Sequence, residues 1–301
     1  MDIIRKLDVA LMSKRFPDFD QNDIQNIQIW LKKCPHLPKL TDYEIFRFLH
    51  AAEFSVEAAK TRIDNFYTFR TKFPQYFGNR DPDTEEIEYI SEVMTQMKLP
   101  KETPDGHSII YMNIFDSQRF TQRLYLKLSN ICGDLECFAD DITEGFIYLI
   151  DMKGFTFSTF ATLNLTEIHK FVVYLTETYP TKIKHAHFIN AQFPIIMDKL
   201  LNMIRPALRS ELANNLHVHS SVESLAKVIP YECLPSDYEG GQLKNSRELS
   251  EEYRKYLLQH RDFFVEEAKQ RRVDEKLRPA KMKSNLDIFG LEGNFKKLDF
   301  D

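Results

Sequence analysis

The chain has 301 residues, of which 43% are hydrophobic and 28% are charged, and its formal net charge is −5 at pH 7. This length favours one large domain with a smaller companion. The acidic balance argues against general nucleic-acid binding, which needs a basic surface to displace counterions from phosphates. The sequence contains no run approaching the roughly 20 apolar residues that cross a bilayer.

The N-terminal region, residues 1–80, is expected to be a small helical bundle. Apolar residues recur at helical spacing from Ile24 onward. Thr41 and Glu44 form a capping box, because the Thr oxygen can accept the third amide while the Glu side chain reaches back. Ser55 is a typical N-cap for the next helix.

The middle region, residues 85–245, alternates apolar strand runs with helical stretches. Strands are expected at 109–114, 146–150, 186–189 and 216–219. Helices are expected near 122–139, 164–179 and 195–213. Strands that alternate with helices indicate βαβ crossovers and a mainly parallel sheet.

The third region, residues 246–301, is expected to be helical to about residue 272 and then basic and polar. From 269 to 283 there are seven Lys or Arg and two acidic residues, a local charge of +5. Such a segment either attracts an anionic membrane, at about 1 kcal/mol per cation near the surface, or is simply solvated.

The four cysteines give no sign of a metal site or a disulfide framework. They form no Cys-x-x-Cys pair, and none lies near a histidine at zinc-finger spacing. The first eight residues carry charge throughout, so we identify no signal peptide. A reducing, cytosolic location is therefore expected.

Seven short motifs occur in order with plausible gaps. They are Arg47-Phe48-Leu49-His50-Ala51, Pro104-Asp105-Gly106, Asp151-Met152-Lys153-Gly154, Tyr179-Pro180, Ile189-Asn190, Arg205-Pro206, and Leu234-Pro235 with Gly240-Gly241. Over about residues 40–242 the chain thereby resembles the CRAL-TRIO lipid-transfer family, and most of all the subgroup that includes alpha-tocopherol transfer protein and cellular retinaldehyde-binding protein.

The resemblance implies an N-terminal helical bundle followed by an α/β domain with a deep apolar pocket and a mobile lid helix that docks on membranes when open. Here the lid would be about residues 193–208. Its apolar positions fall at helical spacing and are Ile196, Leu200, Met203, Ile204 and Leu208. Such a helix can pack on a ligand when shut and on lipid when open, although an ordinary core helix has the same pattern.

The pocket walls are expected on one face of the second strand and on the helices above the sheet. Strand alternation groups Phe146, Tyr148 and Ile150. Helical spacing groups Tyr125, Leu128, Ser129 and Cys132, and again Phe171, Tyr174, Leu175 and Tyr179. The resemblance implies that most of these residues approach the ligand and adds Leu163, and we include Phe188 of the third strand. Ser129, Cys132 or a Tyr hydroxyl could orient one polar ligand group.

The resemblance also implies a phosphoinositide site made of two basic groups, and here the chain departs from the family. The segment after Tyr179-Pro180 supplies the first basic group, but the positions of the second are Glu211 and Asn215, which are not basic. We retain a weak phosphoinositide site at Lys182, Lys184, Arg205 and Arg209.

Two His-x-His pairs invite a metal interpretation, because alternate strand residues share a face. The pairs, His185 with His187 and His217 with His219, lack a third ligand nearby, so we expect no metal. We also find no nucleophile elbow, Walker loop or His-Glu-x-x-His motif, and expect neither an enzyme nor a cofactor.

The favoured function is a monomeric cytosolic carrier that binds one small lipophilic molecule, such as a retinoid, tocopherol, carotenoid or other terpenoid, and transfers it at membrane surfaces. One alternative is a phospholipid or phosphatidylinositol exchange protein, with headgroup contacts inside a larger cavity. Another is an interaction module whose pocket is vestigial.

Overall fold

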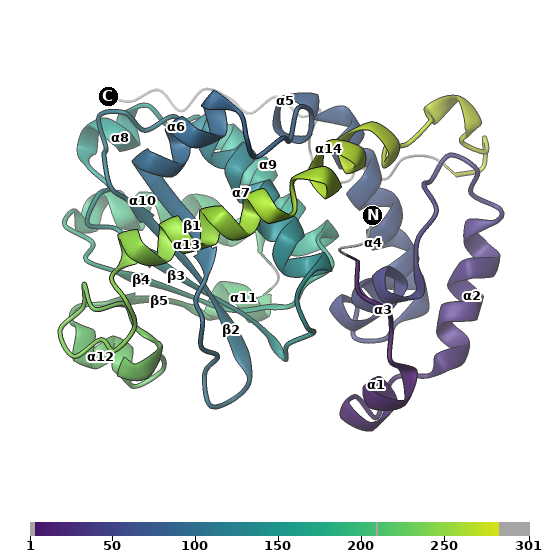
Figure 1. The fold of residues 1–301 in the computed structure, drawn as a ribbon, viewed down its shortest axis with the longest axis horizontal. Helices are drawn as coiled ribbons and strands as arrows, with labels where there is room; N and C mark the ends of the chain where they lie inside the picture. Colours follow the sequence, from purple (N-terminus) through teal and green to yellow (C-terminus); the bar gives the residue numbers. More distant parts are fainter. Residues whose placement is uncertain (1–3, 209, 283–301) are drawn as a thin grey trace.

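The computed structural model describes residues 4–208 and 210–282, and Figure 1 shows a helical N-terminal lobe beside a sheet covered by helices. The lobe contains α1 (Val9–Arg15), α2 (Gln21–Leu31), α3 (Asp42–Ala51), α4 (Val56–Lys72) and α5 (Pro74–Phe77). The predicted capping box is confirmed, because the Glu44 amide donates to Thr41 Oγ1 at 3.3 Å and the Thr41 amide donates to Glu44 Oε2 at 2.8 Å. Ser55 caps α4, as predicted.

The sheet has five strands in the order β1-β2-β3-β4-β5, which is also their order in the chain. They are β1 (Met94–Lys98), β2 (His107–Ile114), β3 (Gly145–Asp151), β4 (Ile183–Ile189) and β5 (Leu216–His219). Strands β2 to β5 are parallel, and β1 is an antiparallel edge strand. The mainly parallel sheet and all four predicted strands are confirmed. Strand β1 and the helix before it, α6 (Glu85–Val93), are additions.

The crossovers gather on one face of the sheet, called here the cavity face. They consist of α7 (Gln122–Phe138), α8 (Phe157–Ala161), α9 (Leu165–Val173), the π-helical turn η1 (Tyr174–Thr178), α10 (Pro194–Ile204), the 3₁₀ turn η2 (Arg205–Ala207) and α11 (Ser210–Asn214). Right-handed crossovers between parallel strands laid down in sequential order all return over the same face. The opposite face packs against α12 (Val222–Ala226), the 3₁₀ turn η3 (Tyr231–Cys233) and α13 (Ser246–Gln259).

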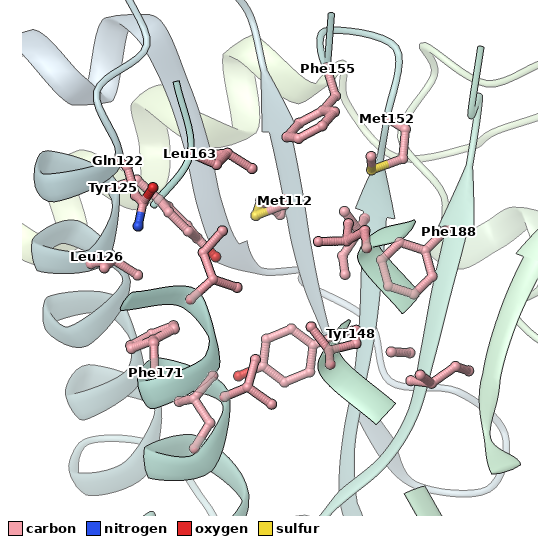
Figure 2. Close-up of a pocket in the computed structure, with 18 of the residues that line it drawn as sticks. Met112, Gln122, Tyr125, Leu126, Tyr148, Met152, Phe155, Leu163, Phe171 and Phe188 are labelled. Atoms are coloured by element: carbon pink, nitrogen blue, oxygen red, sulfur yellow. The ribbon is translucent and has the colours of Figure 1, made fainter. Parts of the chain in front are cut away.

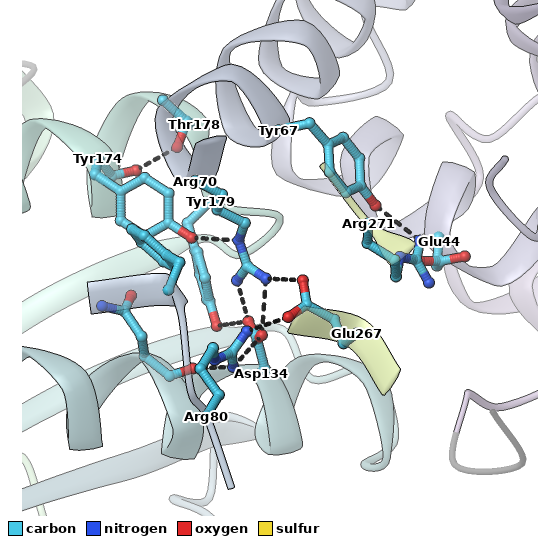
Figure 3. A network of polar contacts seen from close by, with 12 residues as sticks. Glu44, Tyr67, Arg70, Arg80, Asp134, Tyr174, Thr178, Tyr179, Glu267 and Arg271 are labelled. Atoms are coloured by element: carbon cyan, nitrogen blue, oxygen red, sulfur yellow. Dashed lines mark hydrogen bonds and ion pairs between the residues drawn. The ribbon is translucent and has the colours of Figure 1, made fainter. Parts of the chain in front are cut away.

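A buried network of four charged side chains, called here the ion quartet, joins the three regions of the chain (Figure 3). Arg70 of α4 donates to Asp134 of α7 at 2.8 Å and to Glu267 at 2.9 Å. Arg80 donates to the same two carboxylates at 2.5 and 2.6 Å. Glu267 lies on α14 (Arg261–Gln270). Burial opposes ionisation of Asp134, but the two guanidinium groups outweigh it and lower its pKa to about 2.

The three arginines of the C-terminal tail form ion pairs inside the protein, whereas Lys269, Lys276 and Lys281 are exposed. Arg271 forms an ion pair with Glu44, and Arg272 donates to Glu267 at 2.9 Å. Arg278 donates to both carboxylate oxygens of Asp64 at 2.8 Å. The expectation of a membrane-attracting or solvated basic run is therefore wrong for these three arginines, because ion pairs with Glu44, Glu267 and Asp64 hold them. Lys283 lies outside the described residues.

Two of the glycines that carried the family resemblance allow backbones to meet. A Cβ atom on Gly154 would lie 1.9 Å from the carbonyl oxygen of Ile114, and one on Gly241 would lie 2.0 Å from that of Pro235. A side chain at either position would force the two backbone segments apart. Gly154 therefore lets the turn after β3 pack against the end of β2, and Gly241 lets two loop segments meet.

Among the described residues, no helix combines the length and the apolar character needed to span a bilayer.

We predict that Glu267→Ala destabilises the protein by about 3–5 kcal/mol, because removing one partner leaves buried guanidinium charge uncompensated. The neighbouring Glu266→Ala is the matched control. It removes an exposed pair with Lys269 at 3.4 Å and should change stability by less than about 1 kcal/mol. Urea denaturation followed by circular dichroism measures both. Equal unfolding midpoints for the two variants would contradict the central place of the ion quartet.

Candidate functional site

A cavity of about 200 Å³ lies between the cavity face of the sheet and the helices above it (Figure 2). Met112 of β2, Tyr148 of β3 and Phe188 of β4 form its floor, and Tyr125 of α7 and Phe171 of α9 form part of its wall. Strand alternation explains the floor, because successive side chains point to opposite faces. The intervening residues of β3 pack instead into the core on the opposite face.

The cavity lining is almost entirely apolar. No Asp, Glu, His, Lys, Arg, Ser or Cys lines it among the described residues. Of its polar side chains, Gln122 is engaged with the backbone of Asn164 at 2.7 and 3.1 Å. Thr176 donates to the Val172 carbonyl at 3.0 Å. The two tyrosine hydroxyls are therefore the polar groups best placed to meet a ligand.

Burial keeps both tyrosines in the protonated form. It raises the pKa of Tyr125 to about 12 and raises that of Tyr148 well above its ordinary value. Each hydroxyl can therefore donate one hydrogen bond at neutral pH. Figure 2 shows both rings projecting from opposite sides of the cavity, one from α7 and the other from β3.

The structure brings ten of the predicted ligand contacts together around this cavity. They are Tyr125, Tyr148, Ile150, Leu163, Phe171, Leu175, Phe188, Leu200, Ile204 and Leu208. These residues come from β3, β4, α7, α9, η1, the lid segment and the connection between α8 and α9. Their assembly follows from the period of two along strands and 3.6 along helices.

Six predicted contacts lie outside the cavity lining, and the structure corrects the expected wall at these positions. They are Leu128, Ser129, Cys132, Phe146, Tyr174 and Tyr179. The three α7 residues are buried further along that helix, and Phe146 is buried at the start of β3. The Tyr174 hydroxyl accepts from Arg70 Nε at 3.0 Å, and that of Tyr179 donates to Asp134 at 3.0 Å (Figure 3). The ion quartet draws these two rings away from the cavity.

Fifteen lining residues were not predicted. They are Met94, Met112, Ile114, Phe120, Gln122, Leu126, Met152, Phe155, Ile168, Val172, Thr176, Ile183, Ala186, Leu212 and Leu216. For some of these residues, the periodicity of the sequence could have indicated a place in the lining. Alternation in the first predicted strand places Met112 and Ile114 on one face, and helical spacing places Ile168 and Val172 beside Phe171. The loop residue Phe155 and the edge residue Met94 had none.

The predicted lid segment closes one side of the cavity. Leu200, Ile204 and Leu208 line it, while the polar residues of the same helix, Asp198, Lys199 and Asn202, are exposed. The α-helix ends at Ile204, before Pro206, which lacks the amide hydrogen that would continue it. The side chains of Ile196 and Met203, and residue Arg209, lie outside the described residues.

Large apolar side chains are exposed where the lid begins. Ile195 is 74% exposed and Phe193 is 41% exposed. Phe157 of α8 is 66% exposed. Because a protein in water rarely leaves such residues uncovered together, they mark the lid end of the domain as a surface for apolar contact.

The predicted basic site is shallow and of mixed charge. Lys182, Lys184, Glu53 and Glu211 border a depression of about 70 Å³. Arg62 lines it as well, but its guanidinium donates to the carbonyls of Tyr179 and Thr176. Burial lowers the pKa of Lys182. Arg205 is exposed in η2 and does not line this depression. Two carboxylates beside the lysines weaken its attraction for a phosphate group.

The His-x-His pairs lie on the face of the sheet opposite the cavity. Their ring-centroid distances include 5.1 Å between His187 and His217 and 5.1 Å between His187 and His219. The described residues contain no group of three or more His, Cys, Asp or Glu side chains arranged to hold a metal ion.

Comparison with known proteins places this geometry in context. Residues 96–240 match the CRAL/TRIO domain model, and residues 17–87 match the model of a Pinta-like UBA domain. Human alpha-tocopherol transfer protein-like is 26% identical over 278 residues, covering 88% of this chain and 77% of its own. Human clavesin-2 is 26% identical over 245 residues, covering 75% and 70%. A crystal structure of Sfh5 aligns with a TM-score of 0.49 at 14% identity, covering 81% of this chain and 99% of that one.

We predict that Ala186→Phe blocks uptake of an apolar fluorophore. Ala186 lines the cavity from β4, so a phenyl ring there occupies space that a guest would need. Overpacking should cost about 1–3 kcal/mol of stability and leave the fold intact. Val218→Phe is the control, because Val218 is 48% exposed on the neighbouring strand. Fluorescence titration measures both, and equal uptake by the two variants would contradict the assignment of the cavity.

Proposed function

Because this chain carries a CRAL/TRIO domain at residues 96–240 and belongs through it to that lipid-binding and transfer family, we propose that it carries one small lipophilic molecule between membranes. The cargo is a terpenoid-like molecule, such as a retinoid, tocopherol or carotenoid, held in the cavity beneath α10. The protein works in the cytosol as a carrier that touches membranes only transiently. Its four cysteines are all free and buried, which agrees with a reducing compartment.

The observation that carries this proposal is the cavity lining, which has no ionisable group other than two neutral tyrosines. An apolar guest gains about 25 cal/mol for each Å² that it removes from water. A guest with one hydroxyl or carbonyl would lose its water partner at a cost of a few kcal/mol unless the wall replaced it. The Tyr125 and Tyr148 hydroxyls are the groups that could do so.

Phosphatidylinositol or other phospholipid exchange is less well supported. A headgroup inside the cavity would need charged or hydrogen-bonding partners, and none of the described residues that line the wall is a cation.

Membrane contact would occur at the lid. The exposed Phe157, Phe193 and Ile195 lie at the end of the domain where α10 begins. When such side chains insert into a bilayer, the lid can exchange its apolar contact with the cargo for apolar contact with lipid. Lys182 and Lys184 add weak attraction to anionic lipids, with phosphoinositides as the strongest case, but Glu53 and Glu211 reduce it.

Native mass spectrometry of the purified chain, followed by extraction of the bound lipid, tests the proposal and identifies the cargo. A bound mass that matches a terpenoid supports it. Extraction of a phospholipid would support exchange instead. A chain that binds no apolar molecule and takes none from vesicles would overturn the carrier function.

We predict that Leu200→Asp or Ile204→Asp cuts transfer between liposomes at least about tenfold, because a buried unpaired carboxylate disfavours the shut lid and the loaded state. Both residues line the cavity from α10. Asn202→Asp puts the same group on the exposed side of the same helix and should transfer at the wild-type rate. Transfer is followed with a fluorescent lipophile, and circular dichroism verifies folding. Normal transfer by both lid variants would remove α10 from the mechanism.

We predict that Tyr148→Phe weakens binding of a lipophilic alcohol by about 2- to 10-fold, the equivalent of about 0.5–1.5 kcal/mol for one hydrogen bond. The matching hydrocarbon, which lacks the hydroxyl, should bind the variant and the wild type alike. Tyr125→Phe tests the second hydroxyl in the same way. If neither substitution weakens binding of the alcohol relative to the hydrocarbon, the tyrosine hydroxyls do not bind the polar group of the ligand.

A further inference from the structure

Five imidazoles form a continuous cluster on the sheet face opposite the cavity. His185 and His187 of β4 lie 5.7 Å apart between ring centroids, and His217 of β5 lies 5.9 and 5.1 Å from them. His219 is 5.1 Å from His187, and His107 of β2 is 6.4 Å from His185. The cluster therefore crosses from β2 to the edge strand β5.

Hydrogen bonds connect the centre of the cluster to α12. His187 is fully buried, and its Nδ1 lies 2.9 Å from His219 Nε2, while His219 Nδ1 lies 2.9 Å from Ser224 Oγ. A bond between two ring nitrogens holds one proton, so it accommodates neutral rings or a single charge. If both rings were protonated, two N–H groups would face each other and the contact would break.

The surroundings of the cluster offer little compensation for positive charge. Ile147 and Leu149 of β3 are the register partners of His185 and His187, and α12 contributes Ser224. The charged groups that act on the cluster are Lys184, which disfavours protonation of His185, and Glu211, which favours it. Among the described residues, no carboxylate forms an ion pair with these histidines.

The same strands build the cavity from their other side. Ala186 and Phe188 of β4 and Leu216 of β5 alternate with the histidines and line the cavity. Strand β5 has only four residues, pairs with β4 alone, and follows directly on the lid segment and α11. Separation of β5 from β4 would therefore open the wall formed by the lid segment.

We propose that the histidine cluster is a proton-operated latch, in which protonation of two or more of its rings separates β5 from β4 and opens the cavity beside α10. This opening stands independently of what the cavity holds. Only its consequence, faster release of a lipophile at an acidic surface, rests on the proposed carrier function.

The direction of the pH effect follows from whether the closed and the open latch favour neutral or protonated histidines. Burial, together with the neighbouring histidines, lowers the pKa of His187 to about 3 and also lowers those of His185 and His219. The closed state thus holds neutral rings, while opening returns them to an ordinary pKa of about 6.5. The latch is fully closed above pH 6.5 and weakens as the pH falls from there toward 3. At pH 5.5 protonation of His187 on opening raises the open population about tenfold, and each further ring that gains a proton on opening raises it more.

Hydrogen–deuterium exchange of the full chain at pH 7.4 and 5.5, corrected for intrinsic exchange rates, tests the latch. We expect opening of β5, α10 and α11 to become at least about tenfold more frequent at pH 5.5, while β2 and β3 keep their protection. His187→Gln with His219→Gln should abolish most of this response. His219→Gln alone, at a partly exposed position, should abolish part of it if the double variant folds poorly.

His260→Gln is the control, because burial also lowers the pKa of His260, which lies beyond α13 and away from the cluster. It should retain the full response. Equal corrected protection of β5 at both pH values, or an undiminished response in the His219→Gln variant, would overturn the latch.

A second readout follows a fluorescent lipophile released to excess phosphatidylcholine vesicles. Local opening at pH 5.5 with faster release supports the latch and the carrier function together. Local opening in a chain that neither takes up nor releases lipophile leaves the latch standing and counts against the carrier function. Uniform loss of protection through all strands would indicate global acid unfolding and would overturn the latch.

Discussion

The ion quartet is the constraint on which the rest of the structure depends. The side chains of its four members, Arg70, Arg80, Asp134 and Glu267, are at most 2% exposed, so water cannot solvate their charges. Charges removed from water in this way are tolerable only when all partners are present. The N-terminal lobe, the sheet domain and the C-terminal helix therefore form one interlocked unit.

The quartet also shapes the cavity from outside it. Asp134 fixes the middle of α7, and Tyr174 and Tyr179 bond to the quartet from the turn that follows α9. The same two helices turn Tyr125 and Phe171 toward the cavity. The ion quartet thus helps to position the apolar wall of the cavity. One side of these helices bonds to the ion quartet and the other side lines the cavity. For this reason a cavity almost free of polar groups lies one helix away from a dense set of charges.

Local patterns in the sequence were sufficient for much of the fold. Apolar runs located β2 to β5, the Thr41–Glu44 spacing located the start of α3, and alternation in β3 located part of the cavity floor. Strand β1 was missed because its short run, Met94–Lys98, mixes apolar and polar residues with no clear alternation.

Long-range ion pairing has no such local signal. Arg70 meets partners 64 and 197 positions away, so nothing near Tyr174 or Tyr179 in the sequence indicated that charges would recruit their hydroxyls. For the same reason the arginines after α14 resembled a free basic tail. Periodicity along one element placed Tyr125 and Tyr148 in the cavity lining, but it did not indicate how far along α7 and β3 the cavity extends, so Leu128 and Phe146 lie outside it.

The order of the quartet along the chain has a consequence for biosynthesis. Both arginines and Asp134 are translated well before the second carboxylate, Glu267, which follows Arg70 by 197 positions. During translation, the emerging lobe and sheet hold an excess of positive charge that cannot yet be sealed from water. The native interior can therefore close only late, and an apolar guest present during synthesis would meet a chain that is still open.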